Sequence, residues 1–266
     1  MGIRYTGHPP MGPGRAAVLG GIGLLGFFGV WTLASMATTG LPRLLPGPWE
    51  VLQRAAALLG QPFAGDTLPG HLAGSLSRFA MAYGLAVVVG VPLGLAMGRF
   101  RPIEAVVAPL FEALRFIAPI AWVPFAALWF GTGVGGPVLV IFAGAFPPCL
   151  LSAYRGARLV DPQLLEAARM LGTPVLRTMT EVLFPAAIPS LVAGLRVAAG
   201  TAWQSLIGAE LIIVSSGIGY LMVQGQAQIS TATVMSGMIA IGVVGVAIDM
   251  ALRQAEHAVK VRRGLS

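Results

Sequence analysis

The chain has 266 residues, of which 56% are hydrophobic and only 10% charged, and its mean hydropathy is +0.82. Soluble globular domains carry charge on about 25% of their residues, and disordered chains combine low hydrophobicity with high charge, so the composition excludes both classes. An integral membrane protein remains, and at ~20 residues per helical span this length accommodates roughly five to seven spans.

The first predicted element is a transmembrane helix over residues 16–38, preceded by a tail over residues 1–15, because no charged residue occurs from Ala16 to Pro42. A signal peptide is the alternative, and Ser35-Met36-Ala37 resembles a small-residue cleavage site. The apolar stretch is longer than the ~7 to 15 residues of a signal peptide core, so we expect a retained span. Five prolines between residues 40 and 71 then predict a loop, in which Trp49 to Leu59 has the pattern of a short amphipathic surface helix.

The second span is predicted over 72–98, and an uncharged run from Phe116 to Tyr154 follows. As one helix this run would measure ~58 Å, about twice the ~30 Å hydrocarbon core, so it must fold back. The glycine-rich residues 131–136 supply the turn, which predicts spans over 105–130 and 137–157. The first of these is expected to be one helix that includes Glu112 and Arg115, whose i, i+3 spacing allows mutual neutralisation.

Two more apolar segments predict spans over 188–214 and 232–252, so that a single transmembrane domain of six spans covers residues 16–254 and a tail covers 255–266. Between these two spans, residues 215–231 are uncharged and rich in Gly and Gln. That composition suits backbone that lines a cavity or an outer loop.

The basic residues predict the orientation of the six spans, which place both termini on one side. Two basic residues, Arg43 and Arg54, fall on the opposite side, and three fall within spans. Twelve lie on the side of the termini: Arg4, Arg15, Arg99, Arg101, Arg155, Arg158, Arg169, Arg177, Arg253, Lys260, Arg262 and Arg263. This asymmetry predicts cytoplasmic termini and explains the net charge of +7 without nucleic acid as a partner.

The cytoplasmic loop over 158–185 contains the signals of a short capped helix. Asp161 is a good N-cap, Pro162 suits the first helical position, and Gly172 suits the C-terminal stop. Leucine and alanine side chains recur at helical spacing opposite Glu166 and Arg169. A helix of this length is marginal alone, so it needs a partner surface.

The same loop resembles the signature of importer-type ABC permeases, which is Glu-Ala-Ala, three residues, Gly, nine residues, and Ile-x-Leu-Pro. Here Glu166-Ala167-Ala168 and Gly172 match, and Val182-Leu183-Phe184-Pro185 follows at the family's spacing, with Val for Ile and Phe for Leu. Further stretches are similar to the nitrate, sulfonate and taurine subgroup: Leu45 to Pro48, Gly90 to Gly98, Ala121 to Pro124, Leu128 to Gly131, and Gly194 to Arg196 with Trp203.

The resemblance implies an all-helical, six-span permease subunit in a bacterial inner membrane, with the loop helix acting as a coupling helix. A second permease copy, most simply an identical one, two cytoplasmic ATPase subunits that bind ATP and magnesium, and an extracytoplasmic substrate-binding protein would be its partners. Transport of a small anion (sulfonate, taurine or nitrate class) by alternating access is implied. The residues expected to couple the loop to the ATPase are Glu166, Ala167, Ala168, Gly172 and Pro185.

Ionisable residues within spans are costly and are functional hypotheses by default. Arg115 is the best candidate for attracting an anion along the pathway, and Trp122 and Trp203 are candidates for shaping it. Glu210, near the outer end of the fifth span, is a further candidate for lining the pathway, and it is expected to act as a structural partner or a gate rather than as a ligand. Asp249 is expected to meet an arginine near the cytoplasmic end.

Two other classes are considered. An ATP-independent secondary transporter or channel is the alternative, but it leaves the spacing from Glu166 to Pro185 unexplained. A membrane enzyme lacks a catalytic set, because the three histidines have no metal-ligand spacing and no phosphate-binding loop or Gly-x-Ser-x-Gly motif occurs. We expect no cofactor on this chain, whose only lysine is Lys260.

Overall fold

The computed structural model describes residues 13–37, 45–131 and 133–262, in which every regular element is helical. Five helices in these ranges are long and apolar enough to cross a membrane, and one bent pair is a sixth candidate span. The predicted all-helical membrane fold is therefore confirmed. Parts of both predicted tails, with Arg4 and Arg263, lie outside the described residues, as does Arg43.

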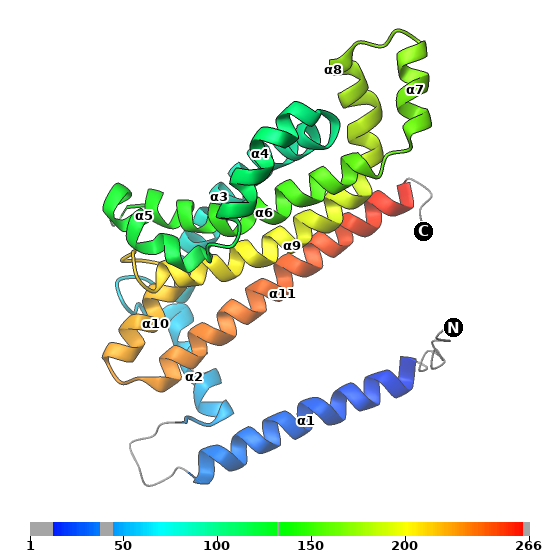
Figure 1. The fold of residues 1–266 in the computed structure, drawn as a ribbon. Coiled ribbons are helices and arrows are strands. Elements are labelled where there is room, and N and C mark those ends of the chain that lie inside the picture. The colour runs from blue at the N-terminus through cyan, green and yellow to red at the C-terminus, as the bar shows by residue number, and fades with distance from the viewer. Residues whose placement is uncertain (1–12, 38–44, 132, 263–266) are drawn as a thin grey trace, which may run out of the picture.

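The first long helix, α1 (Pro13–Ala37), lies beside the bundle rather than within it (Figure 1). None of its described side chains is buried. It is tied to the following segment where the Trp31 indole Nε1 donates a hydrogen bond to the Pro46 carbonyl at 3.1 Å. The predicted amphipathic helix is confirmed as α2 (Pro48–Gly60), which buries Val51 and Leu58 and packs on the bundle.

Three long helices form the centre of the bundle, with α6 (Gly135–Arg158) packed against both α3 (Leu68–Arg99) and α9 (Phe184–Glu210). Glycines make these close approaches: a Cβ at Gly94 would collide with the Leu150 carbonyl, and one at Gly194 with Ser152. Small residues at helix interfaces are the usual means of close packing in membranes, where lipid supplies no hydrophobic drive between helices.

The expectation of one continuous helix over 105–130 is wrong. This region forms α4 (Arg101–Leu114), then η1 (Pro119–Trp122) and α5 (Val123–Phe130), and the two halves are bent by 89°. Pro119 explains the break, because the residue before a proline is pushed out of the helical region. Ala118 accordingly has φ −57° and ψ 138°.

The remaining elements complete the two ends of the bundle, and several helix limits differ from the predicted ones. The helix of the fifth predicted span, α9, begins at Phe184 rather than 188 and ends at Glu210 rather than 214. The last helix continues to Arg262 rather than 252. We name the ends after α7 and α10, which lie at opposite ends in Figure 1. The elements are α7 (Pro162–Met170), α8 (Val175–Arg177), η2 (Thr178–Leu183), α10 (Ile218–Ala227) and α11 (Thr231–Arg262).

Candidate functional site

The predicted coupling helix is α7, and its two ends are fixed as the sequence indicates. The Asp161 carboxylate accepts a hydrogen bond from the Gln163 backbone N–H at 2.9 Å, which caps the first turn. At the other end Gly172 has φ +65°, and the N–H groups of Gly172 and Thr173 bond the carbonyls of Arg169 and Ala168. This is the glycine-dependent Schellman stop.

One face of α7 packs on the chain itself, and the other is exposed. Ala168 is only 6% exposed, and Leu165 lies against the apolar cluster that includes Leu183 and Leu191. Glu166 and Ala167 are exposed, while Pro185 is half-buried at the start of α9. Of the three residues in the Glu-Ala-Ala sequence, only the first two therefore offer side chains to another protein.

The exposed face of the loop is more apolar than a solvated loop should be. Large hydrophobic side chains on it include Leu164, Met170, Leu171 and Leu176, and Met170 is 89% exposed. Contiguous exposed apolar groups on a soluble surface mark an interaction site. The α7 end thus has the properties of a protein interface.

Two cavities meet at the break between α4 and η1. The first, of about 250 Å³, is lined almost entirely by apolar side chains, among them Leu110, Trp122 and Phe142. The second, of about 390 Å³, contains Thr201, Gln204 and Ser205 from α9. Arg115 lines both cavities, so the structure brings two predicted pathway residues, Arg115 and Trp122, to one place.

The other two predicted pathway residues lie elsewhere. Trp203 is nearly buried, packs edge-on against Phe79, and donates a hydrogen bond from Nε1 to the Ile241 carbonyl at 3.2 Å. Glu210 is fully buried at the α10 end. Both residues join helices within the chain in this structure.

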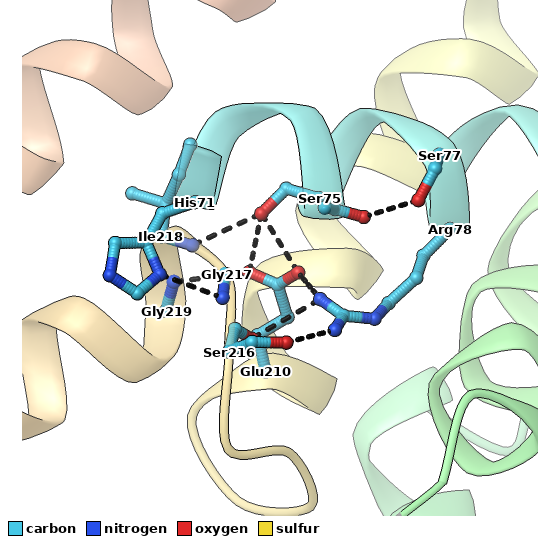
Figure 2. Close-up of polar contacts among 10 residues, drawn as sticks. His71, Ser75, Ser77, Arg78, Glu210, Ser216, Gly217, Ile218 and Gly219 are labelled. Carbon is cyan, nitrogen blue, oxygen red and sulfur yellow. Dashed lines mark hydrogen bonds and ion pairs between the residues drawn. The ribbon is translucent and has the colours of Figure 1, made fainter. Parts of the chain in front are cut away.

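Glu210 is the centre of a buried polar cluster that Figure 2 shows in detail. Its carboxylate accepts hydrogen bonds from the Ser75 hydroxyl at 2.8 Å, the Arg78 guanidinium at 2.8 Å and the Gly219 N–H at 3.1 Å. Arg78 also donates to the carbonyl and the hydroxyl of Ser216. Because these groups come from α3, α9 and the start of α10, the cluster holds three segments together.

His71 and two glycines complete this cluster. His71 Nδ1 accepts from the Gly217 N–H at 3.1 Å, so its other nitrogen, Nε2, carries the proton and donates to the Phe63 carbonyl at 2.9 Å. Gly217 has φ +105°, and a Cβ there would collide with the Glu210 carboxylate. The backbone therefore needs glycine to enclose the carboxylate.

The sequence contains one signal for this cluster, although the sequence analysis did not pair the two residues that carry it. Arg78 and Glu210 are opposite charges near the same end of two apolar spans, and such residues pair inside membranes. The prediction of a structural partner for Glu210 agrees with the pair, although Ser75, His71 and Gly217 were not anticipated.

Asp249 has the arginine partner that the sequence predicts. Arg196 and Arg253 both bind its carboxylate, at 2.6 and 2.7 Å.

These features define a class. The bundle is all-helical and has five to six candidate spans. It also has two adjoining cavities, one of which contains polar side chains, and an interaction surface beyond one end, as a multi-pass membrane permease does. The family described as "Binding-protein-dependent transport system inner membrane component" matches residues 90–259, and the chain belongs to this family.

Comparisons with individual proteins agree. The taurine transport system permease protein TauC of Escherichia coli is 33% identical in an alignment that covers 84% of this chain and 81% of the TauC chain. The putative aliphatic sulfonates transport permease protein SsuC of Bacillus subtilis is 34% identical in an alignment that covers 80% of this chain and 76% of the SsuC chain. An inward-facing structure of the MetNI methionine ABC transporter has the same fold, with a TM-score of 0.63 and 20% identity, and covers 72% of this chain and 94% of the solved one.

The chain is thus a permease subunit of an ABC importer, which works with ATPase and substrate-binding partners. It is a transport subunit and not an enzyme, since the ATPase of this family is a separate subunit. The alternative of an ATP-independent transporter or channel loses its support with this assignment.

Proposed function

We propose that the chain imports a small organic or inorganic anion of the sulfonate, taurine or nitrate class. The support is the naming of its relatives, which are permeases for taurine, aliphatic sulfonates and bicarbonate. Arg115 on the wall of both inner cavities is consistent with an anionic substrate. An extracytoplasmic binding protein delivers the substrate to the α10 end.

The observation that carries the coupling mechanism is the exposed face of α7. Glu166 and Ala167 point away from the bundle beside apolar residues such as Met170, as a docking helix requires. The ATPase receives this face in a groove, and Glu166 meets a basic group of the ATPase. ATP and magnesium are bound by the ATPase and not by this chain.

The opposite face of α7 transmits the movement. Leu165 rests on a cluster to which Leu95 of α3, Ala153 of α6 and Leu191 of α9 contribute, and Ala168 is buried on the same helix. When ATP binding draws the two ATPase subunits together, α7 follows and displaces the ends of these three spans. The pathway then alternates between inward-facing and outward-facing arrangements.

The chain works as a homodimer with both termini cytoplasmic. Exposed hydrophobic side chains on α4 and α5, such as Val106, Leu128 and Trp129, supply surface for a second copy and for lipid. Basic residues gather at the α7 end: Arg99, Arg101, Arg155, Arg158, Arg169, Arg177 and Arg253. That distribution favours a cytoplasmic α7 end, by the positive-inside rule.

The test is to purify the tagged chain from its native membranes in mild detergent and to weigh the intact complex by mass spectrometry. We expect two copies of this chain, two of an ATPase, and ATP hydrolysis that rises when the binding protein and its substrate are added. A stable chain that carries substrate across vesicle membranes without ATP or a second subunit would contradict the proposal.

A further inference from the structure

Two neighbouring cavities with different linings meet at one cation. Arg115, Ala143 and Pro147 belong to the walls of both. On one side are side chains such as Leu110, Leu114 and Phe142, and on the other are polar groups of α9, Thr201 and Gln204. A molecule that lies across this border can place one end beside Arg115 and the polar groups of α9 and the other end among apolar side chains.

The position of this border within the span matters. Arg115 lies ~21 Å along the helix from Arg101, and Gln204 lies ~9 Å before Glu210, so both lie well inside the ~30 Å hydrocarbon core. Residues 115–118, which form the break, are exposed on this chain. Irregular backbone at membrane depth is tolerated only where it is covered by protein or lines a water-filled space. Gln204, also exposed, carries a polar amide that has the same requirement.

The hydrogen-bond donors available to a ligand are few and specific. The hydroxyl of Thr201 donates to the Ala198 carbonyl at 3.0 Å, and that of Ser205 donates to the Thr201 carbonyl at 2.7 Å. Their hydrogens are therefore used within α9. Among the side chains that line the second cavity, the guanidinium of Arg115 and the amide of Gln204 remain as the groups that can donate to an anion.

Arg115 has an acidic partner, which lies away from both cavities. Its Nη2 contacts Glu112 Oε2 at 2.8 Å, and the guanidinium also lies over the Phe116 ring, 4.7 Å from the centroid. Glu112 is not in either wall, and Arg115 is the charged residue among the described residues that line the two cavities. The cavities therefore face the positive end of this pair.

We infer that the two cavities form a membrane-embedded site for an organic anion with a short carbon chain, such as an alkanesulfonate. Its anionic head lies between Arg115 and Gln204 in the polar cavity, and its carbon chain occupies the apolar cavity beside Trp122. The inference rests on the proposed import of anions and narrows it, because an inorganic anion such as nitrate has nothing to place in the apolar cavity.

The experiment measures whether a thiol at position 204 meets water and anions. Cys149, the only cysteine of the chain, is fully buried and is replaced by alanine, and Gln204→Cys is added. The full complex in liposomes is treated with sulfonatoethyl methanethiosulfonate and, separately, with its trimethylammonioethyl analogue. Relative to a free thiol, we expect the anionic reagent to be favoured about tenfold, since a charged cleft concentrates counter-ions by at least this factor.

Two variants should change the preference for the anionic reagent in opposite directions, and a third is a control. Arg115→Gln should abolish the preference for the anionic reagent, and Glu112→Gln should increase it. Val88→Cys is the matched control, because Val88 is 71% exposed on α3 and we expect lipid to cover it, so neither reagent should react. If Gln204→Cys does not fold, as judged by gel filtration, Thr201→Cys replaces it.

The ligand class is tested by protection of the same thiol. Butanesulfonate should slow labelling at far lower concentration than methanesulfonate, with affinity rising about fourfold for each buried methylene. An unreactive thiol at 204, equal rates with the two reagents, or protection by nitrate equal to that by butanesulfonate would overturn the inference. ATPase retention and ATP-driven uptake in the same liposomes test the proposed function separately, so the two can fail independently.

Discussion

The polar cluster at the α10 end is buried and satisfied within the chain, whereas α7 at the other end turns charge and apolar surface outward. Glu210 binds Ser75 and Arg78 with almost no contact with solvent, while Glu166 and Met170 are exposed. A buried polar group must be paired where it lies, and an exposed apolar face gains free energy only from another molecule. The first region fixes the fold, and the second needs a partner.

The largest effect is expected from Glu210→Ala, which breaks the buried cluster. It leaves the Arg78 guanidinium buried without its carboxylate, and removing one partner of a buried ion pair costs about 3–5 kcal/mol. Thermal denaturation in detergent, followed by tryptophan fluorescence, should show a much lower midpoint.

The matched control is Glu181→Ala, which removes the acidic partner of the exposed Arg177–Glu181 pair. An exposed pair of this spacing is worth about 0.3–0.5 kcal/mol, so the midpoint should hardly change. Equal losses in the two variants would show that burial does not distinguish the two ends.

Gly217→Ala is expected to be the next most damaging change. The residue has φ +105°, and its new Cβ collides with the Glu210 carboxylate, so we expect a loss of about 1–3 kcal/mol. Gly242→Ala in α11 is the comparison, because no neighbouring atom meets its Cβ. The thermal midpoint should fall for the first variant and stay level or rise for the second.

Glu166→Arg tests the exposed region. It reverses a charge on the open face of α7, so the thermal midpoint should hold while the amount of ATPase retained in a pull-down falls about tenfold. Gln226→Arg adds an exposed charge on α10 at the opposite end and should retain the ATPase. Full retention with Glu166→Arg would remove this residue from the interface.

Gly172→Ala is the mildest of the set. The residue has φ +65° with open space around its Cβ, so the cost is backbone strain alone, about 1–2 kcal/mol, confined to the end of α7. ATPase retention should fall a few-fold with no change in the midpoint of the bundle. Gly60→Ala, which ends α2 without a positive φ or near neighbours, should leave both readouts unchanged.

The sequence is informative where local chemistry decides the structure. The cap at Asp161 and the stop at Gly172 define α7, and the Glu-Ala-Ala part of the family signature lies in that same helix. Pro119 is a local signal for the break, because a proline restricts its predecessor, whereas the expectation of one helix rested on the length needed to span the membrane.

Pairing across the fold could not be read in the same way. Ser75 and Gly217 reach Glu210 and His71 only because α3 and α9 lie side by side, and no local pattern encodes that contact. The burial of Ala168 likewise depends on the packing of η2 against α7. The burial that separates a docking residue from a supporting one is a tertiary property.

The most direct test of the central claim, that α7 binds the ATPase, is site-specific photo-crosslinking in native membranes. A benzophenone on Met170→Cys, in the Cys149→Ala background, should give a crosslinked product that contains the ATPase. The same group on Leu128→Cys, 86% exposed on α5 near the other end, should not. Crosslinking of the ATPase from Leu128→Cys and not from Met170→Cys would contradict the account.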